Sequence, residues 1–483
     1  MKKIQSYLQE YSYLKSILSL LHWDMETMMP SGAIEDRAKR MSYIQGKLHA
    51  HITSPKYKKL LKDFSKKKGL SKKDEILLKE LKWDYKINHA LPSHHVEELT
   101  LATTHATHAW GIAKKNNNLK MFLPHLQKLI DLKRRETTYF KSKKPYDSLI
   151  KLHDKEFSSE QISKLFSELK VGLLKLTKEV KSDGKFVKVK DLKGPFPIES
   201  QLSLSLHVAK LFGLPETNSR LDISNHPFSI NISPSDQRIT TRYDLNHLDS
   251  LSSTMHEVGH ALYELNLPLE WEGTPFQEAV SLSVHESQSR FWENIIGRSR
   301  PFAQFIHPVM KKQFPKAMNG INHETLFQVF NKSKPGLIRV ESCELYYNLH
   351  IIIRYEIEEM IFNQGLNAKD IPKVWNKKYQ EYLGLTPSSD AEGILQDSHW
   401  AGGAFGYFPT YTLGNLISGT LYFKLKKELP GFKEQIRSGQ FGAILKFLDK
   451  SIHKKGRSIT SKDIVGELGV ENYLEYLSEK FKG

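Results

Sequence analysis

The chain has 483 residues, of which 39% are hydrophobic and 26% charged, and these proportions are typical of a globular protein with a sizeable core. Its single cysteine, Cys343, excludes an internal disulfide and indicates a reducing compartment. No run approaches the roughly 18 apolar residues of a membrane span. The basic N-terminus is not followed by the apolar segment of a secretory signal. We therefore expect a cytoplasmic protein with no membrane partner.

The net charge of +17 raises the question of nucleic-acid binding. Much of the excess is lysine spread along predicted helices and loops, as in residues 56–73. A solvated lysine face is the ordinary explanation for such a distribution. No motif that reads RNA or DNA accompanies the charge, so we do not expect nucleic acid to be a partner.

Apolar residues recur at helical spacing through most of the chain, which predicts an all-α protein. In chain order the predicted helices cover residues 4–21, 34–49, 71–88, 92–115, 122–140, 159–180, 199–212, 254–263, 278–296, 337–362 and 371–383, with more near the C-terminus. Residues 181–197 are rich in lysine and glycine and are predicted to be a loop. Residues 226–243 alternate in polarity around Ser233–Asp236, a pattern that predicts a small antiparallel β element.

The stretch from Thr254 to Tyr263 contains the spacing His-Glu-x-x-His. On a helix, residues four apart lie one above the other, so His256 and His260 present their imidazoles from one face. Two neutral imidazoles in this arrangement can bind one divalent ion. Glu257 lies one step round the helix, where its carboxylate can take a proton from a water that the metal activates.

A catalytic zinc takes three protein ligands and leaves one position for water. The downstream carboxylates are Glu264, Glu270, Glu272, Glu278 and Glu286. Glu264 lies one turn past His260 on the same helix, in a poor position to close the site. Glu278 and Glu286 both lie on the next predicted helix, and spacing alone does not choose between them. Arg290, one turn after Glu286, slightly favours Glu286.

An ordered set of short motifs resembles the carboxypeptidase Taq family of metallocarboxypeptidases over nearly the whole chain. The set comprises Leu21–Asp24 with Met29–Pro30, His226–Phe228, Asp236–Thr240, His256–His260, His285–Gln288, Ile338–Glu341, Gly393–Trp400 and Gly406–Tyr411. Each motif is weak alone, but their order along one chain is specific.

The resemblance implies an almost wholly α-helical fold with a deep substrate groove and a gluzincin-type HExxH core. It implies one domain over residues 1–483, with room for two helical lobes that flank the groove. The implied activity is removal of single residues from peptide C-termini, with broad preference and poor action on C-terminal proline. The implied cofactor is Zn²⁺, which Co²⁺ can replace, and the implied assembly is a homodimer. By this likeness Glu286 is the third metal ligand and Glu257 the general base.

A carboxypeptidase must recognise the terminal carboxylate of its substrate, and the planar fork of arginine suits that task. Arg339 is the first candidate, from the resemblance and because it begins a predicted helix rich in aromatic residues. Arg238 in the β element is the second; its alternative is an ion pair with Asp236. The resemblance also favours Tyr411 as a contact for the substrate terminus.

The oxyanion of a tetrahedral intermediate needs a donor beside the metal. The available side chains are His226, His399, Tyr407 and Tyr411, with packing as the alternative role for His399 and Tyr407. Asp397 is predicted to accept a hydrogen bond that fixes an imidazole, because metal-bound histidines usually donate their other N–H to such a group.

The chain departs from the family pattern at one place. After Ile338–Glu341 the family usually has Ala-Asp, whereas this chain has Ser342 and Cys343 before Glu344 resumes the pattern. We expect Arg339 to keep its anchoring role, and the group that the missing acid would brace to be held less firmly. Cys343 itself is expected to be a buried, inert thiol.

Other functions share some of these features. A metallo-endopeptidase or a dipeptidyl carboxypeptidase would also carry the His-Glu-x-x-His helix, and only substrates distinguish them. A non-enzymatic, basic binder of peptide or nucleic acid would account for the +17 charge. The intact set of predicted ligands argues against the binder, so the sequence predicts a metal-dependent peptidase that acts on peptides with a free C-terminus.

Overall fold

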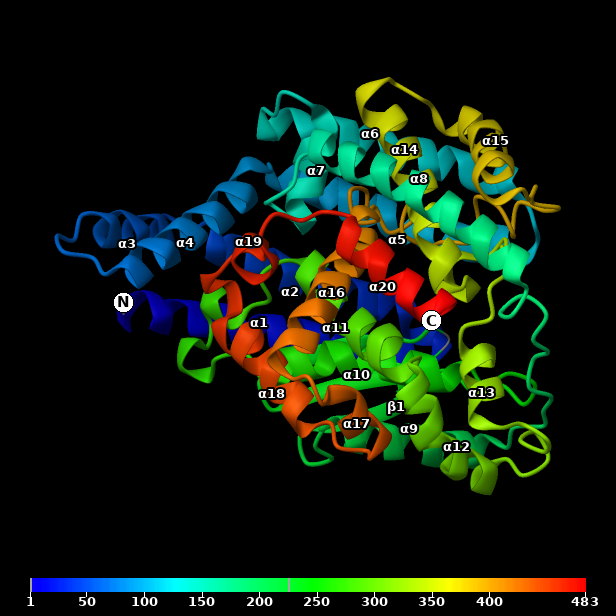
Figure 1. Ribbon diagram of the computed structural model, residues 1–483. Coiled ribbons are helices and arrows are strands. Elements are labelled where there is room, and N and C mark those ends of the chain that lie inside the picture. The colour runs from blue at the N-terminus through cyan, green and yellow to red at the C-terminus, as the bar shows by residue number, and fades with distance from the viewer. Residues whose placement is uncertain (1, 225) are drawn as a thin grey trace. The chain divides into compact units, whose positions relative to one another are not determined.

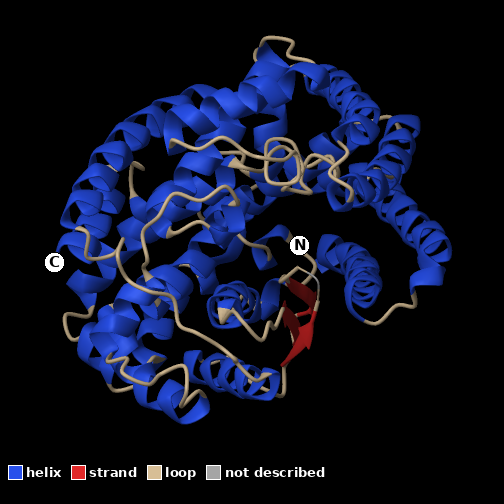
Figure 2. Cartoon of the chain, turned by 90° about the vertical axis from the view of Figure 1, so that its right-hand side faces the viewer, coloured by secondary structure: helices blue, strands red, loops and turns tan. Residues whose placement is uncertain are grey.

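The computed structural model describes residues 2–224 and 226–483, and Figure 2 shows that helices make up most of the chain beside one small sheet. The predicted all-α class is confirmed. Contacts divide the chain into two compact units. The first unit contains residues 1–88, 189–330 and 414–468, and the second contains residues 89–188, 331–413 and 469–483.

The first unit begins with four helices, α1 (Lys2–Thr27), α2 (Ile34–Ile52), α3 (Pro55–Ser65) and α4 (Lys72–Ala90) (Figure 1). Its central helices are α9 (Ile198–Phe212), α10 (Asp249–Leu265), α11 (Leu282–Arg290), α12 (Arg300–Gln313) and α13 (His323–Phe330). Near its end lie α16 (Pro409–Glu428), which starts in the second unit, α17 (Phe432–Arg437), α18 (Gly442–Ser451) and α19 (Ser461–Val465).

The sheet of the first unit has three strands in the order β1–β3–β2. β2 (Ser229–Ser233) pairs antiparallel with β3 (Asp236–Thr241), with Ile230 opposite Arg238, which confirms the predicted hairpin. β1 (Ser219–Ile223) pairs parallel to β3 and was not predicted from the sequence. α10 packs against both β2 and β3, so the sheet supports the helix that carries the His-Glu-x-x-His motif.

Two apolar clusters stabilise the first unit. Ile4, Leu8, Tyr57, Leu61, Leu77, Leu81 and Phe276 are buried together and hold the N-terminal helices. A second cluster of aromatic rings centres on Phe212, whose ring centroid lies 4.6 Å from that of Trp292 and 4.9 Å from that of Phe441. Burial of large aromatic side chains contributes strongly to core stability, and here it holds α9 against the segment that follows α11.

The second unit consists of α5 (Ser93–Lys115), α6 (Leu119–Phe140), α7 (Pro145–His153), α8 (Ser159–Asp183), α14 (Glu344–Asn363), α15 (Ile371–Leu383) and α20 (Glu471–Lys482). α14 is buried around most of its circumference and packs against α7, α8 and α15. A helix that is apolar on nearly all sides belongs in the centre of its unit. The polar residues that α14 carries are therefore held in a rigid, water-poor setting.

Two of the predicted helix boundaries that place candidate site residues are wrong. The helix predicted over 337–362 begins only at Glu344, and Arg339 lies in a short 3₁₀ turn before it. The helix predicted over 278–296 begins at Leu282, capped by the Ser281 hydroxyl, and changes to a π-helix over Phe291–Gly297. Glu278 is thus outside the helix. In the part of the chain that the structure describes, no helix is long and apolar enough to cross a bilayer.

Candidate metal and catalytic site

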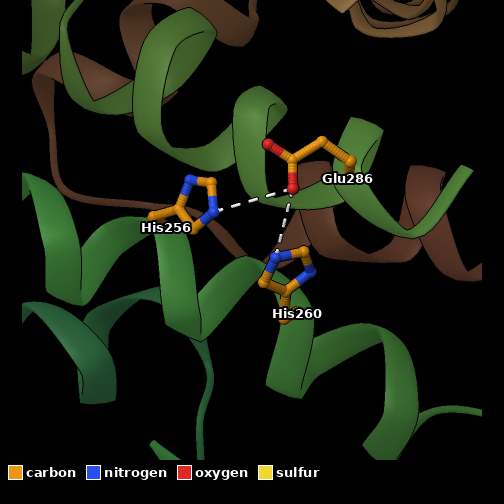
Figure 3. A group of neighbouring side chains, drawn as sticks. All are labelled: His256, His260 and Glu286. Atoms are coloured by element: carbon orange, nitrogen blue, oxygen red, sulfur yellow. Dashed lines mark ion pairs between the residues drawn. The ribbon is translucent and has the colours of Figure 1, made fainter. Parts of the chain in front are cut away.

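Three side chains of the first unit converge on one point, as Figure 3 shows. The Nε2 atoms of His256 and His260 lie 3.7 Å and 3.4 Å from Oε2 of Glu286. One ligand atom from each residue can be chosen so that all three lie within 4.8 Å of one another. Two imidazoles and one carboxylate form the donor set of a catalytic zinc site. The residues present therefore fit a divalent metal.

The two histidines are presented by α10, whose opposite face is buried through Leu251, Met255, Val258 and Leu262. Glycine at position 259 lets α10 and α11 approach closely, because a Cβ there would lie 2.6 Å from the carbonyl oxygen of Gln288. A Cβ on Gly414 would likewise lie 2.9 Å from Cβ of Glu286. The position of Glu286 beside the histidines thus depends on two residues without side chains.

Arg290 orients the carboxylate of Glu286. Its Nε donates to Oε1 of Glu286 at 2.7 Å, which leaves Oε2 facing the histidines. Burial would raise the pKa of Glu286, but Arg290 and the two histidines together hold that pKa below its usual range. Glu286 is therefore ionised, as a metal ligand must be. The choice of Glu286 over Glu278 agrees with this geometry, because Glu278 instead pairs with Lys15 and Arg457 at 2.7 Å each.

Each histidine also has a partner on its other ring nitrogen. Nδ1 of His256 lies 2.9 Å from Oε2 of Glu293, and Nδ1 of His260 lies 2.6 Å from Nδ1 of His285. Such contacts fix the tautomer and orientation of metal ligands. Asp397 was predicted to hold an imidazole in this way, and that prediction is wrong for the two candidate ligands, because Glu293 and His285 occupy those positions.

Glu293 was missed by the sequence analysis. It lies on the π-helix that follows α11, a rare element that is often found at functional sites. It also accepts hydrogen bonds from Arg290 at 3.3 Å and from Arg298 at 2.7 Å. The available signal was its position seven residues after Glu286, which corresponds to two turns and so to the same helix face.

Glu257 lies beside the ligands on α10 and is buried. Burial raises its pKa to about 7, with Glu286 and Glu293 acting in the same direction and His256 in the opposite one. A carboxyl group whose pKa lies near neutrality suits a general base and acid. Among the described residues we find no hydrogen bond to its carboxylate.

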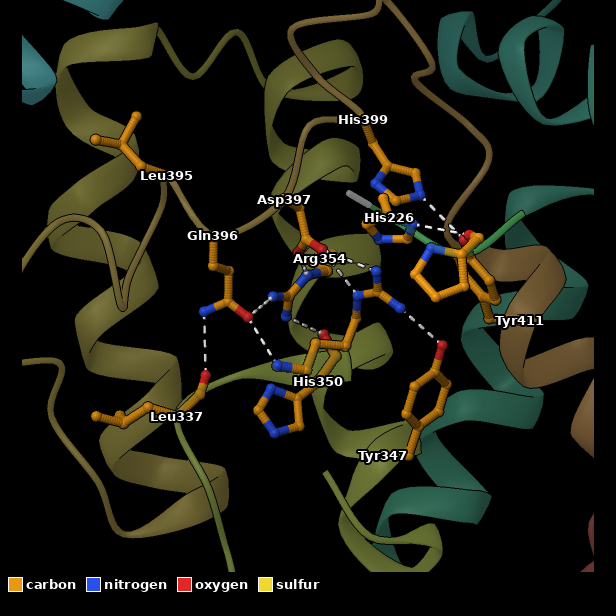
Figure 4. Close-up of polar contacts among 12 residues, drawn as sticks. His226, Leu337, Tyr347, His350, Arg354, Leu395, Gln396, Asp397, His399 and Tyr411 are labelled. Carbon is orange, nitrogen blue, oxygen red and sulfur yellow. Dashed lines mark hydrogen bonds and ion pairs between the residues drawn. The ribbon is translucent and has the colours of Figure 1, made fainter. Parts of the chain in front are cut away.

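The second unit contains a buried cluster of two arginines on one carboxylate (Figure 4). Asp397 accepts from Nε and Nη2 of Arg339 at 3.0 and 2.8 Å through Oδ1, and from Nε of Arg354 at 2.6 Å through Oδ2. Nη1 of Arg339 donates to the hydroxyl of Tyr347 at 2.8 Å. Burial would raise the pKa of Asp397, but the two guanidinium groups hold that pKa well below its usual range.

Tyr411, His399 and Tyr407 lie together in the second unit. The Arg339 guanidinium lies 5.0 Å from the ring centroid of Tyr411, and Nε2 of His399 lies 3.1 Å from the Tyr411 hydroxyl. The ring of Tyr407 lies 5.4 Å from that of Tyr411. The three side chains therefore form one polar aromatic cluster beside Arg339.

Arg238 and His226 belong to the first unit. Arg238 donates from Nε and Nη2 to the two carboxylate oxygens of Asp236, at 2.9 and 2.8 Å, and stacks 4.3 Å from the ring centroid of Trp23. This is the ion pair named as the alternative for Arg238. His226 is exposed, and its Nδ1 lies 2.9 Å from the carbonyl oxygen of Pro227.

The family model for the carboxypeptidase Taq (M32) metallopeptidases matches residues 3–481. The chain belongs to this family. It is a metallocarboxypeptidase, and the family assignment confirms the predicted enzyme class and implies a metal cofactor and peptide substrates. A non-enzymatic binding protein is no longer a rival.

Relatives match over nearly their full length. "Carboxypeptidase 1" of Bacillus subtilis is 36% identical over 99% of this chain and 97% of its own. The solved structure of Pyrococcus furiosus carboxypeptidase is 34% identical, covers 99% of this chain and 98% of its own, and gives a TM-score of 0.96. Trypanosoma cruzi metallocarboxypeptidase 1 is 34% identical over 100% of this chain and 99% of its own, with a TM-score of 0.95.

Proposed function

We propose that this metallocarboxypeptidase binds Zn²⁺ through His256, His260 and Glu286 and uses Glu257 as the general base to release single C-terminal residues. The observation that supports this proposal is that Nε2 of His256 and Nε2 of His260 both face Oε2 of Glu286. The other polar atom of each of these three side chains contacts a separate partner. A set of ligands oriented in this way is pre-arranged for a cation. Co²⁺ has the same ligand preferences and is the proposed substitute.

When bound, the metal supplies Lewis-acid polarisation of the scissile carbonyl and lowers the pKa of water. The work of the chain itself is proton transfer and orientation. Glu257 takes the proton from the attacking water and passes it to the leaving amine, for which a pKa near neutrality is suitable. Glu293, His285 and Arg290 hold the three ligands in place.

We propose that Arg339 and Tyr411 recognise the terminal carboxylate of the peptide. Arg339 and Arg354 share the single carboxylate of Asp397, so this group of three side chains carries one positive charge more than negative. An anionic substrate terminus would balance that charge. His399 and Tyr407 neighbour Tyr411 and are proposed as further substrate contacts, as are Arg238 and His226 of the first unit.

The resemblance to the family supports three further proposals: broad specificity with poor action on C-terminal proline, assembly as a homodimer, and a cytoplasmic location. Sedimentation equilibrium should give twice the mass of the chain. A single-chain mass would contradict the homodimer and leave the catalytic proposal intact.

Glu257→Gln tests the proposed base. This variant should bind zinc as tightly as the wild type and lose about 10²–10⁴-fold in kcat. His256→Ala and Glu286→Ala should lose the metal itself. Wild-type turnover by purified Glu257→Gln would show that another group is the base.

Arg339→Met tests the proposed recognition of the substrate carboxylate. A rise in KM with retained zinc would support this role of Arg339, and an unchanged KM would refute it.

A further inference from the structure

A chain of three hydrogen bonds runs from strand β2 to His260 within the first unit. Nδ2 of Asn231 on β2 donates to Oε2 of Glu264 at 2.7 Å. Oε1 of Glu264 lies 2.8 Å from Nε2 of His285, and Nδ1 of His285 lies 2.6 Å from Nδ1 of His260. No feature of the sequence alone assigned a role to His285.

The chemistry of these groups determines where the protons lie. The Glu264 carboxylate only accepts, so Nε2 of His285 must donate to it. A neutral His285 then has its lone pair at Nδ1, and Nδ1 of His260 must donate to that lone pair. The Nε2 of His260 is left without a proton, and this is the atom that faces Glu286. The bond pattern therefore selects the metal-binding tautomer of His260.

The geometry of the two rings agrees with this assignment. The two rings lie close together, with planes 29° apart, centroids 4.5 Å apart and the two Nδ1 atoms 2.6 Å apart. Tyr263 packs its ring 5.5 Å from that of His285. Glu264 is ionised, because the hydrogen bond from His285 and the charges around it outweigh burial and lower its pKa. His285 is thus held from two sides.

The two candidate ligand histidines are supported differently. Nδ1 of His256 contacts the carboxylate of Glu293 directly, whereas Nδ1 of His260 is linked to the carboxylate of Glu264 through the ring of His285. An imidazole acceptor orients the donor ring through a hydrogen bond and places no negative charge against it, whereas a carboxylate forms a stronger, charge-assisted bond. Orientation is therefore the main contribution of His285.

We propose that His285 is a positioning residue that fixes the tautomer and ring orientation of His260, and that Glu264 and Asn231 hold His285 for this task. The inference rests on the metal site proposed above. The same hydrogen bonds link strand β2 to the candidate ligand His260. A shift of β2 would therefore move the His260 ring through Glu264 and His285.

Zinc affinity, measured by competition with a chromophoric chelator, tests the proposal without reference to turnover. His285→Phe keeps a ring but loses both hydrogen bonds, and it should bind Zn²⁺ about 10–100-fold more weakly. His285→Asn retains an acceptor for the His260 Nδ1–H and should lose less. The matched control is His453→Phe, because His453 is buried in the same unit, lies against Tyr263 and bonds to Asp449 and Gln288. Its affinity should stay within about twofold.

The outcomes separate the two proposals. Wild-type protein that binds zinc no better than His256→Ala would refute the metal site itself. Wild-type affinity in folded His285→Phe, or an equal loss in His453→Phe, would overturn the role of His285 alone. If His285→Phe does not fold, the test uses His285→Asn and Glu264→Gln. Each of these variants should bind zinc at least about threefold more weakly than His453→Phe. Zinc affinities equal to that of His453→Phe would overturn the proposal.

Discussion

Arg290 donates from Nε to Oε1 of Glu286 at 2.7 Å, one helical turn away on α11, and from Nη1 to Glu293 at 3.3 Å. One guanidinium group therefore serves both the proposed carboxylate ligand and the carboxylate that supports His256. All three side chains are buried. Because two carboxylates share it, this arginine should be needed for folding as well as for metal binding.

Arg290→Met should lower the free energy of unfolding of the metal-free protein by about 3–5 kcal/mol, because the buried Glu286 loses the arginine that pairs with it. Glu293 loses one partner and keeps Arg298 and His256. The matched control is Arg300→Met, since Arg300 pairs with Glu324 at a half-exposed position and should cost about 1 kcal/mol or less. Urea denaturation in the presence of EDTA measures both. Equal losses in the two variants would contradict the special role of Arg290.

Gly259→Ala should weaken zinc binding and destabilise the protein. The added Cβ would lie 2.6 Å from the Gln288 carbonyl oxygen and 2.7 Å from Cα of Ser289, so α10 and α11 must move apart and separate Glu286 from the histidines. We expect a loss of about 1–3 kcal/mol. Gly111→Ala is the control, because no atom lies within 4 Å of its added Cβ in α5, and it should stabilise by about 0.5–1 kcal/mol. Thermal melts and zinc titrations check both variants, and zinc affinity unchanged in Gly259→Ala would refute this account.

Cys343→Asp should stabilise the second unit. Cys343 is the N-cap residue of α14, and its side chain makes no capping hydrogen bond. An aspartate at this position would accept from the first-turn N–H groups, and an N-cap of this kind contributes about 0.5–2 kcal/mol. Cys343→Ala should show no such gain. An aspartate variant no more stable than the alanine variant, by urea denaturation, would show that position 343 does not act as a cap.

Because Glu358 is buried in the second unit, we expect the free energy of unfolding to fall as the pH rises towards neutrality. Its carboxylate accepts from Tyr146, Trp400 and the Gly406 amide, yet burial raises its pKa to about 7. Since the pKa in the unfolded chain is about 4.3, the folded state binds the proton more tightly. The stabilisation is complete below about pH 4.3 and is lost as the pH rises through about 7.

Glu358→Gln removes this titration. Between pH 5 and pH 7 the wild type should lose about 2–3 kcal/mol more than the variant in the free energy of unfolding. Other titrating groups are common to both proteins and cancel in the comparison. Parallel curves for wild type and variant would show that Glu358 does not have a raised pKa.

Local periodicity was sufficient to predict most helices, the hairpin and the pair His256 and His260, because each depends on residues close together in sequence. The choice of Glu286 over Glu278 needed the family resemblance, since both were expected on one helix and only the structure shows Glu278 outside it. β1 was missed because it is only five residues long. It pairs with β3, which follows it in the chain only after β2, so no local pattern indicates the pairing.

The supporting residues of the site were harder to predict. Helical periodicity places Glu293 on the same face as Glu286, but it does not predict that this face meets α10, where Glu293 contacts His256. Asp397 was expected to hold an imidazole because that is a common role for a carboxylate near a metal. Its actual partners, Arg339 and Arg354, are separated from it by 58 and 43 positions in the chain, and contacts at that separation carry no local signal.

The central claim is that this enzyme removes single residues from free C-termini, and one measurement tests it most directly. Purified, zinc-loaded protein is incubated with three versions of one peptide: free at both ends, blocked at the N-terminus, and amidated at the C-terminus. Mass spectrometry then identifies the products. The account predicts stepwise loss of single C-terminal residues, abolished by amidation and by chelator and unaffected by the N-terminal block. Internal cuts, or release of dipeptides from the C-terminus, would contradict it.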